Sequence, residues 1–331
     1  MKRKKKLLVI FCPIAAVLLA LGIFLIVWYC GASYPQFGAL ARAEFEIPGL
    51  SEGVCPQGLC ALPENEAGYD FAMSGYLSEG ASRVYLIDEE GEAETRYVTV
   101  LEHGVADASH FGGVACSDKY LYVASGERIA RLSLAEAAAA ESGGGVEAEY
   151  FSAGLNAAFC QYDGNLLYVG EFYRPGNYET PESHHLQTSD GGMNHAVVYA
   201  YEVDGEGAPA PTPKFALSVC DQVQGIAVYE GGIALSCSYG LADSAIRVYE
   251  NVTGTETDKT FDVGGAAVPL YVLDGSVLRG TLTAPCMSEE IAVRGGRLYI
   301  LFESKANKYK LFTRVRMSHV QSVALADLAS L

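Results

Sequence analysis

The chain of 331 residues is short of tryptophan and of basic residues, and each shortage excludes something. Its only tryptophan, Trp28, lies in an apolar segment near the N-terminus, so the rest of the chain has no indole platform for stacking on a sugar. Lysine and arginine number 23 against 40 acids, and the basic cluster in residues 2–6 leaves a charge of about −22 on the remainder. Such a surface repels phosphate backbones, which excludes nucleic acid as a partner.

Several motifs of metal binding and catalysis are missing too. Because the chain has no CxxC pair, no structural zinc site is predicted, and it has neither a GxSxG nucleophile elbow nor a phosphate loop. Seven cysteines lie in residues 43–331, and an odd number cannot all pair within that part of the chain. Buried free thiols, packed as small apolar side chains, are the simplest interpretation. A local disulfide between Cys55 and Cys60 is the alternative.

The N-terminus carries the pattern of a membrane anchor. Residues 1–6 hold the basic cluster, and residues 7–29 are apolar and uncharged over a length that spans a bilayer core. The positive-inside rule then places the N-terminus in the cytoplasm and the rest of the chain outside it. A cleaved signal peptide is the alternative. We therefore expect a single-pass plasma-membrane protein with a linker at 30–42 and one extracytoplasmic domain at 43–331, of a composition typical of bacteria.

One short pattern recurs five times in this domain: a polar residue, a run of small and apolar residues, and a second strand-like run. Apolar and polar residues alternate along the runs, and glycine-containing turns separate them, as in antiparallel strands. The intervals between the polar lead residues are 53, 46, 68 and 66. Such repetition is typical of a β-propeller. The lead residues are Gln57, His110, Asn156, Gln224 and Glu290.

The repeats fill the domain and predict an all-β fold, a propeller of five blades with four strands each. The last repeat lacks a strand after residues 319–325, and residues 44–47 can supply it and close the ring. Two repeats carry insertions, at 174–194 and 252–273. If the second insertion forms a degenerate blade together with residues 276–279, the propeller has six blades.

The first strand of each propeller blade lines the central channel, and the second strand returns beside it. We therefore expect the five lead residues around one channel mouth, as a pocket for a small polar ligand; the alternative is that they only satisfy backbone groups in turns. The second strands end at the same rim, where Glu171 and Glu303 are further carboxylate candidates. The predicted pocket lining is Gln57, His110, Asn156, Gln224, Glu290, Tyr76, Tyr173 and Tyr239.

Three motifs at the starts of repeats, Pro56-Gln57-Gly58, Asn156-Ala157-Ala158 and Ser288-Glu289-Glu290, resemble those of gluconolactonase-like and paraoxonase-like calcium propellers. The resemblance extends over the repeat plan of the domain. It implies a calcium ion at the channel mouth with Asn156 and Glu290 among its ligands, and a lactonase type of activity. Zinc is the second cation to consider, because His184 and His185 in the first insertion, together with His195 and His110, are nitrogen ligands that could meet if the insertion folds over the channel.

Together these features predict a membrane-anchored binding or scaffolding module, whose partner is a small polar ligand or a protein or glycan of the cell envelope. The alternative is a metal-assisted hydrolase, lactonase-like or a glycosidase, that uses the same pocket. A metal held by Asn156 and Glu290 would activate water. A glycosidase needs two carboxylates about 5 to 10 Å apart, for which Glu290 with Glu171 or Glu303 are the candidates.

Overall fold

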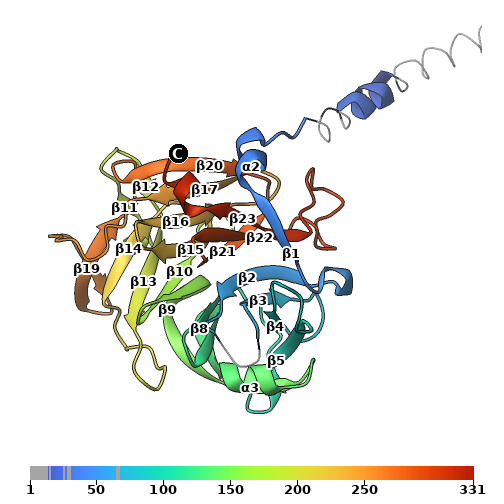
Figure 1. Cartoon of the computed structure of the whole chain (residues 1–331). Coiled ribbons are helices and arrows are strands. Elements are labelled where there is room, and N and C mark those ends of the chain that lie inside the picture. Colours follow the sequence, from blue (N-terminus) through green and yellow to red (C-terminus); the bar gives the residue numbers. More distant parts are fainter. Residues whose placement is uncertain (1–13, 15, 25–26, 28–30, 65–67) are drawn as a thin grey trace, which may run out of the picture.

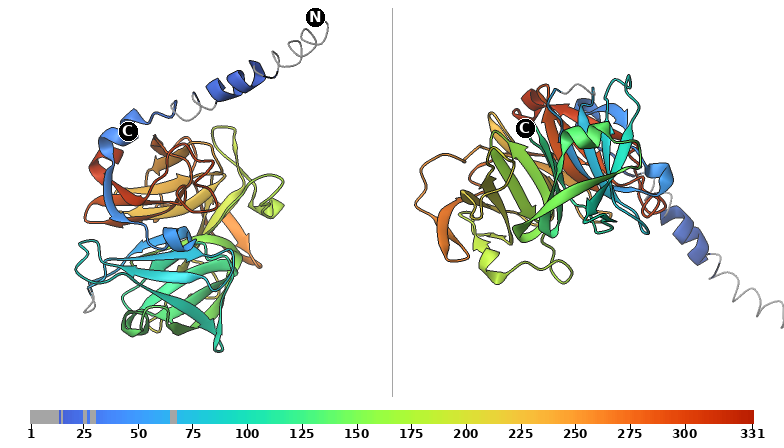
Figure 2. Two further views of the ribbon diagram at one scale, coloured as in Figure 1. Left: turned by 90° about the vertical axis from the view of Figure 1, so that its right-hand side faces the viewer. Right: turned by 90° about the horizontal axis from the view of Figure 1, so that it is seen from below.

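The computed structural model describes residues 14, 16–24, 27, 31–64 and 68–331, and shows a body of β-strands from which a helix at 16–24 projects (Figure 1). Among the described residues, no helix is both long and apolar enough to cross a membrane. The predicted leader at 1–6 and much of the predicted anchor at 7–29 lie outside the described residues. The C-terminus lies beside α2 (Pro35–Leu40), close to where the helix leaves the body (Figure 2).

Within residues 31–64 and 68–331, the strands form five four-stranded units in chain order, which we number one to five. Unit one is an antiparallel meander with a short extra strand at its edge. It begins after a turn of 3-10 helix, η1 (Leu50–Glu52). Its strands are β2 (Cys55–Ala61), β3 (Phe71–Tyr76), β4 (Arg83–Ile87), β5 (Arg96–Glu102) and β6 (Val105–Ala106).

Unit two contains two long strands that turn back at glycines. The strand β8 (Tyr120–Ser133) turns back on itself near Gly126, whose φ is +60°. The two ends of the strand therefore meet, and the backbone amide of Leu134 donates to the carbonyl of Lys119. The strand β9 (Gly145–Asp163) bends at Gly154, so that its first part is the outer strand of unit two and its second part the inner strand of unit three. The unit also contains β7 (Val114–Cys116) and α3 (Leu134–Ala139).

Units three and four continue the same plan, and each carries an insertion. Unit three adds β10 (Leu166–Glu171), β13 (Ala196–Glu202) and β14 (Phe215–Val219), with η2 (Glu182–His184), β11 (Leu186–Gln187) and β12 (Met193–Asn194) in its insertion. Unit four consists of β15 (Val223–Tyr229), β16 (Gly232–Cys237), β17 (Ser244–Tyr249) and β20 (Leu278–Ala284).

The second insertion does not form a sixth unit in the described chain. Its hairpin, β18 (Thr260–Val263) and β19 (Ala266–Val272), extends unit three, because β19 pairs in parallel with β14. The residues that follow enter β20, the fourth strand of unit four. The alternative of a degenerate blade is therefore wrong, since the insertion is divided between two existing sheets.

Unit five is completed from the other end of the chain. Its own strands are β21 (Ser288–Arg294), β22 (Arg297–Phe302) and β23 (His319–Ala324), followed by α4 (Leu325–Leu328). The fourth strand is β1 (Arg42–Glu46), which pairs antiparallel with β23. A closing strand from the segment before the first repeat was predicted at 44–47, and it begins two residues earlier. Closure removes two exposed strand edges.

The core of the molecule lies between neighbouring units. The first strands contact one another in the cyclic order β2, β7, β9, β15, β21 and back to β2. Five buried apolar clusters fill the spaces between successive units, including the space between units five and one. Because successive side chains of a strand point to opposite faces, one strand serves two clusters: Val114 and Cys116 face unit one, while Ala115 faces unit three. The arrangement is propeller-like, around a central channel.

Candidate functional site

Glu290 lies inside the channel, with 1% of its surface exposed, and not at the mouth where it was predicted. One carboxylate oxygen accepts hydrogen bonds from the amides of Leu59 at 2.7 Å and Val114 at 2.8 Å, and the other accepts from the amide of Cys160 at 3.0 Å. Burial raises the pKa of Glu290, and the three amide donors oppose that shift. One side chain of unit five thus joins the inner strands of units one, two and three.

Glycines in the inner strands make room for this side chain. A Cβ on Gly113 would lie 2.3 Å from a carboxylate oxygen of Glu290, and a Cβ on Gly225 would lie 2.6 Å from its Cα. Gly58 occupies the corresponding position of unit one, because it lies opposite Ser74 as Gly225 lies opposite Ser236. The glycine that follows the lead residue in these repeats is therefore a packing requirement of the channel.

The mouth of the channel contains Glu289 and Glu303, two buried carboxyl groups in hydrogen-bond contact. Burial raises the pKa of Glu303 to about 7, although hydrogen bonds from Cys55 and Gln57 favour its charged form. Burial and the neighbouring Glu303 raise the pKa of Glu289. Because two adjoining carboxyl groups cannot readily both ionise in a buried site, the pair holds one proton near neutral pH.

Polar side chains from units one and four surround this pair. The thiol of Cys55 donates to Glu303 at 2.9 Å, and the amide nitrogen of Gln57 donates to the same oxygen at 3.0 Å. The amide nitrogen of Gln224 donates to Glu289 at 3.3 Å. Gln57 and Gln224 were both predicted in the pocket lining, and the structure brings them together around the carboxyl pair.

His110 and Tyr76 form the outer layer of the same group. His110 Nε2 lies 2.9 Å from Gln57 Oε1, and its ring lies 4.1 Å from the ring of Tyr76. The ammonium of Lys308 donates to the hydroxyl of Tyr76 at 3.0 Å. Partial burial, followed by the positive charge of Lys308, lowers the pKa of His110. Exposure increases from the buried Glu289 outward to His110, so solvent reaches the group from the His110 side.

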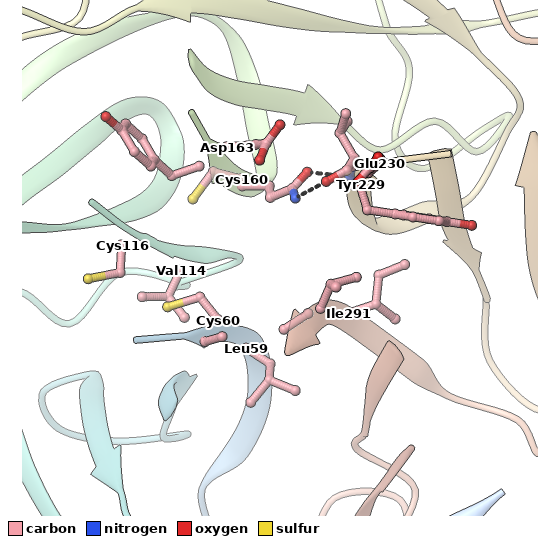
Figure 3. Close-up of a pocket in the computed structure, with 15 residues that line it drawn as sticks. Leu59, Cys60, Val114, Cys116, Cys160, Asp163, Tyr229, Glu230 and Ile291 are labelled. Carbon is pink, nitrogen blue, oxygen red and sulfur yellow. Dashed lines mark hydrogen bonds between the residues drawn. The ribbon is translucent and has the colours of Figure 1, made fainter. Parts of the chain in front are cut away.

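A cavity of about 260 Å³ lies toward the opposite end of the channel (Figure 3). Its lining residues follow the mouth residues along the same first strands, with Cys60 after Gln57 and Ile291 after Glu289. The side-chain amide of Gln161 in this lining makes two hydrogen bonds to the backbone of Val228. Its nitrogen donates to the carbonyl at 3.1 Å, and its oxygen accepts from the backbone N–H at 2.7 Å. The walls combine apolar and polar side chains, with Asp163 and Glu230 among the polar ones, and three buried thiols contribute to them: Cys60, Cys116 and Cys160.

Glu171 anchors the first insertion and does not take part in the channel mouth group. Its carboxylate lies 2.7 Å from Nδ1 of His184 and accepts from the amide of Val197 at 3.1 Å. Both partners of the Glu171–His184 pair are buried. The prediction that Glu171 is a rim carboxylate is therefore wrong, because its side chain fastens the insertion to unit three.

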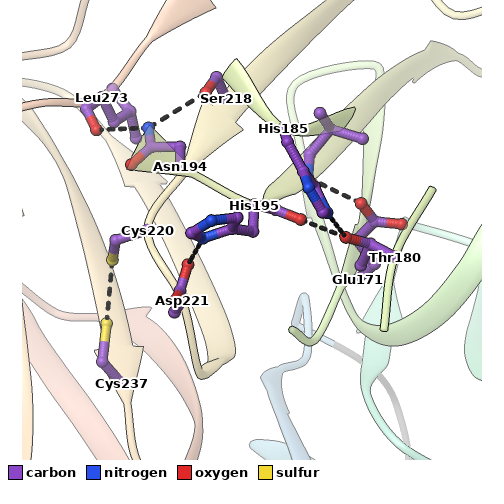
Figure 4. A network of polar contacts seen from close by, with 11 residues as sticks. Glu171, Thr180, His185, Asn194, His195, Ser218, Cys220, Asp221, Cys237 and Leu273 are labelled. Atoms are coloured by element: carbon purple, nitrogen blue, oxygen red, sulfur yellow. Dashed lines mark hydrogen bonds and ion pairs between the residues drawn. The ribbon is translucent and has the colours of Figure 1, made fainter. Parts of the chain in front are cut away.

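Tyr173 and Tyr239 also contact the first insertion. The ring of Tyr173 lies 5.3 Å from the ring of His185 in the insertion and stacks at 4.5 Å on His195, which directly follows the insertion. Figure 4 shows His195 beside Asp221, with 2.8 Å between His195 Nδ1 and a carboxylate oxygen. The guanidinium of Arg174 lies 4.1 Å from the ring of Tyr239. No contact between these two tyrosines and the mouth group is seen among the described residues, so they form a separate polar surface.

The predicted metal site at Asn156 and Glu290 is not assembled. Asn156 is exposed and lies four residues before Cys160 on an extended strand, roughly 13 Å from the amide that Glu290 binds. Both carboxylate oxygens of Glu290 are occupied by backbone amides. In residues 31–64 and 68–331, no three His, Cys, Asp or Glu side chains are placed to hold a metal ion.

The predicted alternative of a disulfide between Cys55 and Cys60 is also wrong. All cysteines in the described part of the chain are free thiols. Cys55 and Cys60 are five residues apart on β2, which separates their Cα atoms by roughly 16 Å, whereas a disulfide needs less than about 7 Å.

Three residues of the mouth were missed in the sequence: Cys55, Glu289 and Lys308. The register of unit five shifts between Ser288 and Ile291, as it does beside Gln57 and Gln224 in units one and four. Glu289 is thus the counterpart of Gln57, and Glu290 is the counterpart of the glycine that follows. Aligning the repeats on that glycine would have assigned Glu289 to the mouth. Lys308 lies in a loop outside the repeat, where no pattern indicates it.

No family model and no curated protein matches this chain. Among solved structures, it is similar to the PQQ-bound aldose sugar dehydrogenase of Streptomyces coelicolor, with 14% identity, 86% of this chain and 96% of that chain covered, and a TM-score of 0.45. Glutaminyl cyclase of Myxococcus xanthus matches at 11% identity, 86% and 94% coverage, and a TM-score of 0.39. A putative glucose dehydrogenase of Thermus thermophilus matches at 13% identity, 86% and 98% coverage, and a TM-score of 0.39. These likenesses are too distant to indicate an activity.

Proposed function

We propose that the chain is a five-bladed β-propeller that binds a small polar ligand at the channel mouth, through Glu303, Glu289 and Gln57. The carboxyl pair carries this proposal. A buried pair that holds one proton offers both a donor and several acceptor lone pairs at the bottom of a polar group. Such a pair is costly to bury, and buried ionisable groups with shifted pKa values are concentrated at functional sites.

The ligand that fits this mouth donates several hydrogen bonds. The groups nearest the solvent are the Gln57 amide and the His110 and Tyr76 rings, which together offer polar edges and one aromatic face. Neutral hydroxylated compounds and primary amines match these groups, because both donate hydrogen bonds to carboxylates. We therefore expect a sugar-like or amine-bearing ligand of small size.

The geometry favours binding over hydrolysis. A glycosidase holds its two carboxyl groups about 5 to 10 Å apart, with the bond between them, whereas Glu289 and Glu303 are in hydrogen-bond contact. Glu290 is buried, and both of its carboxylate oxygens accept hydrogen bonds from backbone amides, so it is not presented to a substrate or metal at the mouth. These contacts support a binding module.

The test is ligand-induced thermal stabilisation of the purified full-length chain. The probes are neutral monosaccharides and small primary amines, measured one at a time with the wild type, Glu303→Gln and the exposed control Glu256→Gln. We expect at least one probe to raise the melting temperature of the wild type and of the control but not of Glu303→Gln. Equal stabilisation of all three chains, or no stabilisation by either class, would contradict the proposal.

The setting of this module is a proposal from the sequence. The basic cluster at 1–6 and the apolar run at 7–29 support a plasma-membrane anchor, with the propeller outside the cytoplasm and within reach of envelope proteins or glycans. Protease treatment of intact cells tests this topology. Digestion of the propeller without cell lysis is expected, and protection until lysis would contradict it.

A further inference from the structure

Two thiols outside the channel approach each other between units three and four. Cys220 lies in the connection between β14 and β15, and Cys237 ends β16. Their sulfur atoms are 3.5 Å apart (Figure 4). Cys237 is buried, whereas Cys220 is partly exposed. The pair therefore has one sulfur that a small reagent can reach and one behind it.

A partly buried cation adjoins this pair. Arg247 lies opposite Leu235 on the neighbouring strand, which places it on the same face of the sheet as Cys237. Its Nε is buried and has no hydrogen-bond partner among the described residues. A buried guanidinium nitrogen without a partner is costly, and a thiolate beside it would compensate for part of that cost.

The remaining groups around Cys220 determine where the negative charge lies. The hydroxyl of Tyr249 donates to the sulfur of Cys220 at 3.9 Å. The thiol of Cys237, then Arg247 and Tyr249, lower the pKa of Cys220 to about 7, against burial and the negative charge of Asp221. The neighbouring Cys220 and burial raise the pKa of Cys237. Cys220 is thus the more acidic thiol of the pair, and it is also the more exposed of the two.

We propose that Cys220 and Cys237 form a redox-active pair that closes to a disulfide by exchange with small disulfides such as oxidised glutathione. The Cys220 thiolate attacks one sulfur of glutathione disulfide, which forms a mixed disulfide and releases one glutathione thiolate. Cys237 then loses its proton and attacks the Cys220 sulfur, which releases the second glutathione. The protein loses two hydrogen atoms, and one glutathione disulfide becomes two thiols.

Closing the pair requires only a small movement. The sulfur atoms must approach from 3.5 Å to about 2.05 Å. The connection that carries Cys220 also contains Asp221 and Gln222. The carboxylate of Asp221 contacts His195, and the backbone N–H of Gln222 donates to the carbonyl of Tyr173. The disulfide would therefore fasten the first insertion to unit four through this connection.

The experiment incubates the reduced full-length chain in glutathione buffers of increasing oxidation, quenches it with acid, and maps thiols by peptide mass spectrometry. The variants are Cys220→Ser, Cys237→Ser and, as a matched control, Cys286→Ser. Wild type and the control are expected to lose two hydrogen atoms and to yield a cross-linked peptide that joins Cys220 to Cys237. Cys237→Ser is expected to accumulate glutathione on Cys220, at least about tenfold more than Cys220→Ser accumulates on Cys237.

Two results would overturn this proposal. The first is a wild type that keeps both thiols at every glutathione ratio while a strong chemical oxidant joins other cysteines. The second is glutathione on Cys237 in Cys220→Ser to the same extent as on Cys220 in Cys237→Ser, since the assigned thiolate would then be incorrect. Arg247→Gln supplies an independent measurement, because removing the cation should slow alkylation of Cys220 at neutral pH by severalfold.

Discussion

The carboxylate of Glu290 occupies the space that a side chain on Gly113 would need, with 2.3 Å between one carboxylate oxygen and the Cβ position. The same Cβ would lie 2.3 Å from the amide nitrogen of Cys160 and 2.6 Å from the Cα of Phe159, and these backbone atoms cannot move independently. An acidic residue from unit five and a glycine from unit two are therefore matched across the channel.

Gly113→Ala is expected to destabilise the fold by about 2 to 4 kcal/mol, because the added methyl group displaces both the carboxylate and the β9 backbone. Chemical denaturation of the purified chain measures this change. Gly205→Ala is the matched control, because nothing lies within 4 Å of its Cβ position. Equal stability of the two variants would show that the channel is not packed as described.

Glu290→Gln keeps the shape of the side chain but replaces one acceptor oxygen with an NH₂ group. At least one of the amides of Leu59, Val114 and Cys160 then faces a donor. We expect a loss of about 2 to 4 kcal/mol in the free energy of unfolding. Glu256→Gln, an exposed change of the same chemistry, should leave it unchanged. An unchanged free energy of unfolding in Glu290→Gln would contradict the role of Glu290 as an acceptor for three strands.

The raised pKa of Glu303 makes stability depend on pH. Its pKa is about 7 in the folded chain against 4.5 ordinarily, so the folded state binds the proton more tightly than the unfolded state. This contribution is fully present below pH 4.5 and is lost as the pH rises toward 7. Wild type should therefore lose about 3 kcal/mol more than Glu303→Gln over this window. If the free energies of unfolding of the two chains changed with pH in the same way, the raised pKa of Glu303 would be contradicted.

The pair of Glu171 and His184 should control how firmly the first insertion is held. Glu171→Ala removes the partner of His184 and of the Val197 amide, both of which are buried contacts. We expect hydrogen exchange within residues 174–194 to accelerate about tenfold or more while the other units stay protected. Glu182→Ala, an exposed change in the same insertion, is the control. Unchanged exchange in Glu171→Ala would show that other contacts hold the insertion.

The sequence predicted the units better than the positions within them. Alternation and glycine turns located the five repeats, and the missing strand of the last one indicated the closing segment, because an unpaired edge is costly. Register is harder to predict, since a bulge adds one residue without changing composition. That single residue exchanged the roles of Glu289 and Glu290. His110 and Asn156 begin their repeats four residues before the amides that Glu290 binds, whereas Gln57 begins two residues before.

The contacts of the first insertion could not be predicted from the sequence, for a different reason. Which face of unit three the insertion covers depends on tertiary contacts such as Glu171 with His184 and Tyr173 with His195. These pairs are 13 and 22 residues apart in the chain, in segments without periodicity. The approach of Cys220 to Cys237 is likewise set by the connection between two sheets, for which the sequence contains no spacing motif.

The most direct test of the channel mouth is a pH titration of its carboxyl groups by difference infrared spectroscopy, from about pH 5 to pH 9. The wild type should show a protonated carboxyl band that decreases near pH 7, as Glu303 ionises, and this step should be absent in Glu303→Gln. A wild type with no carboxyl titration near neutral pH, or a Glu303→Gln chain with the same step, would contradict a shared proton between Glu289 and Glu303.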